Sequence, residues 1–213
     1  MTNSSISSRS ALVRRGLTSS AIAAIASISL ALPALAHHPF GGETPQTLWA
    51  GIFSGIAHPV LGVDHFVFVI ALGLLAAVVR CGVLVPAAFL MAALVGTGLH
   101  LGALDLPAAE IVIAGSVGLF GLLVTAHERL SVGAIAALSG IAGLFHGYAY
   151  GEAIVGSEPT PLVAYLIGFT LVQAAIAFLA YLVASRASNI VTIRHAGFAI
   201  FGAGAALLSG LVL

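Results

Sequence analysis

Long apolar segments with few charges between them constrain this chain more than any other feature. They run over residues 48–79, 83–104, 107–126, 132–150, 161–184 and 195–213. A helix needs about 20 mostly apolar residues to cross the hydrocarbon core of a bilayer. Because backbone polar groups must be satisfied internally in lipid, such segments are expected to be helical. The sequence therefore predicts an all-α, polytopic integral membrane protein with about six transmembrane helices.

Composition agrees with this fold class and excludes several functions. Hydrophobic residues make up 60% of the 213 residues and charged residues 7%, whereas about a quarter of a soluble domain is charged. A soluble enzyme and a nucleic-acid-binding domain are therefore excluded. All 7 basic residues are arginine, so no lysine is present for a P-loop ATPase domain or a Schiff base. The single cysteine, Cys81, excludes an intrachain disulfide and a multi-thiolate metal site.

The N-terminal residues 1–36 have the pattern of a cleaved signal peptide. Arg14 and Arg15 form a basic n-region, small and apolar residues follow, and Ala34-Leu35-Ala36 fits an A-x-A cleavage site. The alternative is an ordinary first membrane helix. With cleavage, the mature chain is a single transmembrane domain over residues 37–213.

Arginines mark alternate connections between the apolar segments. Arg80 lies between the first and second segments, and Arg129 lies between the third and fourth. Arg186 and Arg194 lie between the fifth and sixth. The other connections and segment ends carry acids instead: Glu43, Asp105, Glu110, Glu152 and Glu158. The positive-inside rule then predicts a bacterial inner-membrane protein with its arginines in the cytoplasm and its mature N-terminus in the periplasm.

Ionisable residues inside an apolar span are costly and therefore mark candidate functional sites. The first group is His58-Pro59-Val60-Leu61-Gly62-Val63-Asp64-His65. On a continuous helix the two imidazoles would lie about 10 Å apart along the axis, too far to share one ion. Pro59 and Gly62 predict a break in this span, which would bring both imidazoles together. Otherwise the two histidines are successive binding stations.

A second group, Phe145-His146-Gly147-Tyr148-Ala149-Tyr150-Gly151-Glu152, lies near the predicted outer end of the fourth span. Both groups place a carboxylate six residues after a histidine. Imidazole with carboxylate suits borderline divalent ions such as nickel, cobalt and zinc. The predicted metal-binding residues are His58, Asp64, His65, His146 and Glu152, with His37 and His38 as an outer chelate.

The remaining histidines and the glycines have simpler interpretations. We expect His100 to be a hydrogen-bonding partner between helices, His127 to lie on the surface of an inner loop, and His195 to lie at the membrane interface. Glycines at alternating positions predict close helix packing; they are Gly96, Gly98, Gly102, Gly115, Gly118 and Gly121.

These motifs resemble those of the HupE/UreJ family of nickel permeases. His58-Pro59-x-x-Gly62-x-Asp64-His65 is similar to the first-span signature of the family, and Phe145-His146-Gly147-x-Ala149-x-Gly151-Glu152 to its fourth-span signature. The similarity covers most of the mature chain. At Tyr150 many relatives have a second histidine, and this departure leaves the metal preference open between nickel, cobalt and other divalent ions.

The resemblance implies a secondary or passive permease that imports Ni²⁺ for hydrogenase or urease maturation, and not an enzyme. No catalytic residue and no resident cofactor are expected. The expected partners are the divalent ion and the lipid bilayer, with no nucleic acid, and a homo-oligomer is compatible. The alternatives are a permease for Co²⁺ or another divalent ion, an accessory component of a larger transporter, and a metal-dependent or haem-dependent membrane enzyme. In the haem enzyme, His58 and His146 would be the axial ligands.

Overall fold

The computed structural model describes residues 44–187 and 189–212, so the predicted signal peptide over 1–36 and the candidate ligands His37 and His38 lie outside it. The described elements are all helices, which confirms the predicted fold class for this part of the chain. They are α2 (Leu48–Leu61), α3 (Val63–Val78), α4 (Leu84–Leu101), α5 (Ala109–Thr125), the 3₁₀ helix η1 (His127–Arg129), α6 (Val132–Glu152), α7 (Pro159–Ser185) and α8 (Ile190–Val212).

Within the described residues, the helices α4, α6, α7 and α8 are long and apolar enough to cross a membrane. The helices α2 and α3 make a fifth candidate span if the bent pair counts as one. The sequence predicted about six spans, and the difference lies in α5, an apolar helix of 17 residues. It begins later than expected because Pro107 and the left-handed Ala108 (φ 57°) precede its first turn.

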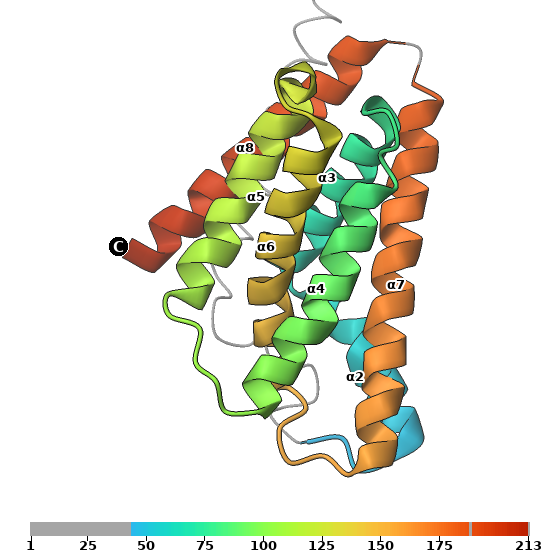
Figure 1. The fold of residues 1–213 in the computed structure, drawn as a ribbon, viewed down its shortest axis with the longest axis vertical. Helices are drawn as coiled ribbons and strands as arrows, with labels where there is room; N and C mark the ends of the chain where they lie inside the picture. The colour runs from blue at the N-terminus through green and yellow to red at the C-terminus, as the bar shows by residue number, and fades with distance from the viewer. Residues whose placement is uncertain (1–43, 188, 213) are drawn as a thin grey trace, which may run out of the picture. The chain divides into compact units, whose positions relative to one another are not determined.

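The helix connections alternate between two ends of the described helices. Figure 1 shows the α3–α4, α5–α6 and α7–α8 connections at the top and the α4–α5 and α6–α7 connections at the bottom. The top connections carry Arg80, Arg129 and Arg186, and the bottom connections carry Asp105 and Glu158. We call these the arginine end and the acidic end. The predicted alternation of charge is therefore present in the fold.

The first predicted span is broken, as the sequence indicated. The helices α2 and α3 meet at an angle of 79°. The break falls at Gly62, whereas Pro59 stays inside α2. A Cβ atom at Gly62 would lie 2.7 Å from Cδ2 of His65, so the close approach of this ring requires glycine.

Three helix pairs pack closely through glycines: α2 with α7, α4 with α6, and α5 with α8. A Cβ at Gly147 would clash with the backbone of Ala93 on α4, and one at Gly121 would clash with the backbone of Phe201 on α8. Small residues at such contacts are how membrane helices approach one another. Of the predicted packing glycines, Gly98 and Gly115 face open space instead, and Gly102 contacts only the backbone of its own helix.

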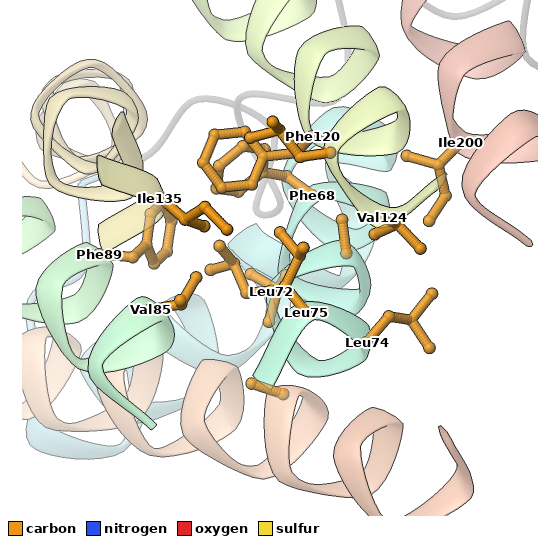
Figure 2. Packing of buried hydrophobic residues seen from close by; sticks show 14 of the residues in the cluster. Phe68, Leu72, Leu74, Leu75, Val85, Phe89, Phe120, Val124, Ile135 and Ile200 are labelled. Atoms are coloured by element: carbon orange, nitrogen blue, oxygen red, sulfur yellow. The ribbon is translucent and has the colours of Figure 1, made fainter. Parts of the chain in front are cut away.

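Apolar side chains fill the space around α3 towards the arginine end. Phe68, Leu72 and Leu75 of α3 are fully buried. Figure 2 shows Leu72 and Leu75 between Val85 of α4 and Val124 of α5. The helix α3 also contacts α2, α7 and α8, so it lies centrally among the described helices.

Candidate metal-binding site

The break between α2 and α3 brings two predicted ligands together. His58 lies in the last turn of α2 and His65 in the first turn of α3, and both side chains are 0% exposed. Their ring centroids are 5.5 Å apart. A continuous helix would hold them at about twice that separation. The bend at Gly62 therefore favours one shared site over two successive stations.

His146 of α6 joins this pair. Its Nδ1 lies 2.7 Å from Nδ1 of His65, and its Nε2 lies 3.0 Å from Oγ of Ser116 on α5. His146 is also 0% exposed. Three imidazoles from α2, α3 and α6 thus lie together in the interior, and we call His58, His65 and His146 the histidine cluster.

Two tyrosines and a glutamine connect the histidine cluster to α7. Oη of Tyr165 lies 3.2 Å from Nδ1 of His58, and the Tyr165 hydroxyl donates to the carbonyl oxygen of Tyr150 at 2.8 Å. The Tyr150 hydroxyl donates to Oε1 of Gln173 at 2.8 Å. The Tyr150 ring also packs edge-on against His65, with centroids 4.6 Å apart. These buried polar groups are hydrogen-bonded, as a low-dielectric interior demands.

The two predicted carboxylates lie in different surroundings. Asp64 is in the first turn of α3, where its Oδ1 accepts a hydrogen bond from the backbone N–H of His65 at 2.8 Å and lies 4.0 Å from Nδ1 of that ring. Its side chain is 20% exposed, so it lies at the edge of the cluster. Glu152 is exposed at the end of α6, about 9 Å along the helix from His146. The structure thus brings Asp64 to the cluster and leaves Glu152 at the acidic end.

The histidine cluster does not form a closed ligand set. Across residues 44–187 and 189–212, no group of three or more His, Cys, Asp or Glu side chains is arranged to hold a metal ion. His58 and His65 are neighbours, but both nitrogens of His146 already lie within hydrogen-bonding distance of other groups. An ion at this position would therefore have few protein ligands.

The cluster lies much nearer to the acidic end than to the arginine end. His146 is six residues from the end of α6, and Tyr165 is six residues from the start of α7, which places both about 9 Å from that end. On the other side, the Phe68 ring packs against His146 with centroids 4.4 Å apart. Phe68 also contacts Phe89 at 5.1 Å and Phe120 at 4.7 Å. These three rings, the phenylalanine layer, separate the cluster from the arginine end.

Sequence reasoning missed three polar residues of this site: Ser116, Tyr165 and Gln173. Each stands inside an apolar segment, and a polar group there must find an internal partner. A glutamine inside an apolar segment could have identified Gln173 as a site residue, and in the structure its side chain is 0% exposed. The partner of each residue depends on which helices meet, and no spacing along the chain gives this.

The remaining histidines divide between confirmed and corrected interpretations. His100 packs against the Tyr148 ring of α6 with centroids 4.4 Å apart, but among the described residues its Nδ1 has no hydrogen-bond partner, so the expected hydrogen bond between helices is not found. His127 was expected on the surface of an inner loop, but it is 9% exposed, and its Nδ1 lies 3.2 Å from the carbonyl oxygen of Val124. His127 is buried because η1 places its ring against the end of α5. His195 is exposed near the start of α8.

These features define an all-helical protein with several candidate membrane spans and a buried polar site at a helix break. The family model described as HupE / UreJ protein matches residues 25–207, and the chain belongs to this family. Over 186 residues the chain is 34% identical to Protein HupE of Rhizobium leguminosarum bv. viciae, a match that covers 85% of this chain and 94% of that protein. No solved structure matches the chain significantly.

Proposed function

We propose that this protein is a secondary or passive permease that carries Ni²⁺ across the inner membrane into the cytoplasm, where it supplies hydrogenase or urease maturation. The observation that carries the proposal is the buried pair His58 and His65 at the Gly62 break, in a member of the HupE/UreJ family. Imidazole nitrogens are preferred ligands of borderline divalent ions. Buried ionisable groups at a discontinuous membrane helix are typical of ion pathways.

We further propose six membrane crossings, with α5 as one of them. In Figure 1, α4 ends at the acidic end and α6 begins at the arginine end, so α5 runs between the two. Its 17 residues are at the lower limit of the length that crosses a bilayer. The positive-inside rule assigns the arginine end to the cytoplasm. The acidic end then faces the periplasm, where its carboxylates raise the local concentration of cations.

In this proposal the ion approaches from the acidic end and meets Asp64 before His58 and His65. Asp64 is the partly exposed member of the group, and the two imidazoles lie behind it. Glu152 is an earlier contact, because it lies at the acidic end and away from the cluster. His37 and His38 remain predicted members of an outer capture site. Since few protein ligands meet at the cluster, we expect modest affinity and partial retention of hydration water, which allows release.

The membrane potential is sufficient to drive such import without ATP. A divalent cation moving inward gains about 4.6 kcal/mol at 100 mV, from roughly 2.3 kcal/mol per charge. Each 1.4 kcal/mol corresponds to about a tenfold ratio, so this free energy supports about three decades of accumulation. A permease of this kind needs a site that binds the ion weakly and a pathway that opens from that site to the cytoplasm.

Co²⁺ is the second candidate substrate, because the same imidazole and carboxylate groups bind it. A haem-dependent enzyme fits less well. His146 was the expected second axial ligand, but its two nitrogens lie 2.7 Å from His65 and 3.0 Å from Ser116. The Phe68 ring also packs against it, with centroids 4.4 Å apart, which leaves no room there for a porphyrin.

The test is uptake of radiolabelled Ni²⁺ by metal-starved cells that express the wild type, Asp64→Ala or His65→Ala at equal membrane levels. His195→Ala is the matched control, since that histidine is exposed and lies on α8. We expect uptake by the wild type and the control and none by the two site variants. Competition by Co²⁺ measures the metal preference. No uptake above empty cells, with wild-type protein present in the membrane, would overturn the proposal.

A further inference from the structure

We propose that Ser116 and Tyr165 are positioning residues that fix which nitrogen of each buried histidine faces the ion, and that His146 transmits this constraint instead of binding the metal. The inference deepens the proposed function and rests on it in one respect, namely that His58 and His65 are the ligands. Its basis is two separate sets of hydrogen bonds, one that joins Ser116, His146 and His65 and one that joins Tyr165 and His58.

The single hydroxyl proton of Ser116 determines which atom is the donor in its contact with His146. A serine hydroxyl has one proton, and Ser116 donates it to the carbonyl oxygen of Ile113 at 2.7 Å. Nε2 of His146, 3.0 Å from the same Oγ, must therefore be the donor in that contact. A neutral imidazole carries one N–H, so Nδ1 of His146 is left as an acceptor.

This assignment determines the tautomer of His65. Its Nδ1 lies 2.7 Å from the acceptor Nδ1 of His146, so His65 must carry its proton on Nδ1. A metal-binding imidazole is neutral, because the ion needs an unprotonated ring nitrogen. In the neutral ring, Nε2 of His65 then carries the lone pair that a metal ion needs.

The Tyr165 hydroxyl determines the tautomer of His58 in the same way. Its hydroxyl proton goes to the carbonyl oxygen of Tyr150 at 2.8 Å, so its oxygen accepts from Nδ1 of His58 at 3.2 Å. His58 is therefore also protonated on Nδ1 and carries its lone pair on Nε2. Two independent hydrogen-bond chains, one from α5 through α6 and one from α7, thus give His58 and His65 the same tautomer.

The consequence is a division of roles within the histidine cluster. His58 and His65 offer Nε2 lone pairs from rings whose centroids are 5.5 Å apart. His146 uses Nδ1 to accept and Nε2 to donate, so it orients His65. Groups that orient metal-binding histidines in this way typically change metal affinity or activity by about 10-fold to 100-fold when they are removed.

The tautomers can be measured without transport. Full-length protein labelled with ¹⁵N-histidine, in lipid nanodiscs, distinguishes protonated from unprotonated ring nitrogens by their ¹⁵N chemical shifts. Signals are assigned with single His→Gln variants. We expect protonated Nδ1 at His58 and His65 and protonated Nε2 at His146. Protonated Nε2 at His58 or His65 would overturn the inference. The expected tautomers in a protein that takes up no Ni²⁺ would support the inference and count against the proposed function alone.

Uptake kinetics of positioning variants give the second measurement. Ser116→Ala and Tyr165→Phe are expected to lower the ratio of maximal Ni²⁺ uptake rate to KM by about tenfold or more, with Ser116→Thr retaining it. Matched controls are Ser139→Ala, which removes a buried hydroxyl bonded to the Val85 carbonyl oxygen, and Tyr181→Phe. Unchanged uptake and unchanged tautomers in Ser116→Ala and Tyr165→Phe would show that these hydroxyls position nothing.

Discussion

The two halves of the described helices differ in what fills the space between them. In the half near the acidic end, buried imidazoles, hydroxyls and an amide are linked by hydrogen bonds. In the half near the arginine end, the interior is mostly apolar, with side chains such as Leu72, Leu75 and Val124, and its buried Ser139 hydroxyl bonds to a backbone carbonyl oxygen. The same helices α3, α5 and α6 pass through both halves, so the change is one of side chains and not of backbone.

This contrast separates a region that can hold an ion from a region that excludes one. Transfer of a divalent ion from water into an apolar interior without ligands costs many kcal/mol. The phenylalanine layer lies directly beside His146, so the boundary between the two regions is about one side chain thick. For the ion to pass to the arginine end, the side chains of the apolar half must move apart or water must enter between them. The polar half must hold the ion until this happens.

The largest expected effect concerns stability in the apolar half. Phe120→Ala removes a fully buried ring that contacts Phe68, and we expect a loss of about 3–5 kcal/mol in the free energy of unfolding. Uptake per folded molecule should be retained, since no polar group is touched. The measurement is denaturant unfolding in micelles alongside uptake. The neighbouring Leu119→Ala is the control, because Leu119 is 42% exposed, and an equal loss there would contradict a packed apolar half.

The opposite pattern is expected at the helix break. Gly62→Ala keeps a permitted backbone, since φ is −70°, but its Cβ would lie 2.7 Å from Cδ2 of His65. The ring must move, and we expect uptake to fall by about tenfold while the unfolding free energy changes little. Gly98→Ala on α4 is the control, because no heavy atom lies within 4 Å of an added Cβ there. Normal uptake by Gly62→Ala would show that the ring position is not critical.

The sequence predicts the two halves unequally. The break at Gly62 and the pairing of His58 with His65 are local features, because eight residues on one segment contain both Gly62 and the two ligands. The helical segments and the alternation of arginines are also local patterns. For these features the sequence expectations agree with the structure.

The links from the cluster to other helices are not local. The contact of His146 with Ser116 requires α5 and α6 to be neighbours in one register, and the contact of His58 with Tyr165 requires the same of α2 and α7. Apolar segments of similar composition do not specify which of them pair. Glu152 was grouped with His146 by spacing, although helix geometry separates the two by about 9 Å along α6.

A smaller effect is expected from adding a ligand to the polar half. The ring centroid of Tyr150 lies 5.1 Å from that of His58 and 4.6 Å from that of His65, so Tyr150→His adds a further imidazole next to the two proposed ligands. More ligands bind the ion more tightly and release it more slowly. We therefore expect a few-fold lower KM and a few-fold lower maximal uptake rate.

The matched variant for this test is Tyr150→Phe, which removes the hydroxyl bonded to Gln173 and adds no ligand. It should not lower KM. Equilibrium binding of Ni²⁺ to both purified variants measures the affinity directly. Weaker binding by Tyr150→His than by the wild type would contradict a site next to Tyr150.

The smallest expected effect distinguishes the two ends. Asp105 and Glu158 are exposed at the acidic end, and the double variant Asp105→Asn, Glu158→Gln should raise KM for Ni²⁺ uptake by about twofold at low ionic strength. The effect should disappear in high salt, where the screening length falls to about 3 Å at 1 M. Glu128→Gln is the control at the arginine end, where this exposed carboxylate lies 3.4 Å from Arg194. If the acidic end receives the ion, only the double variant raises KM. If Glu128→Gln alone raises it, the ion enters from the arginine end, and the phenylalanine layer, not the histidine cluster, is the first barrier that it meets.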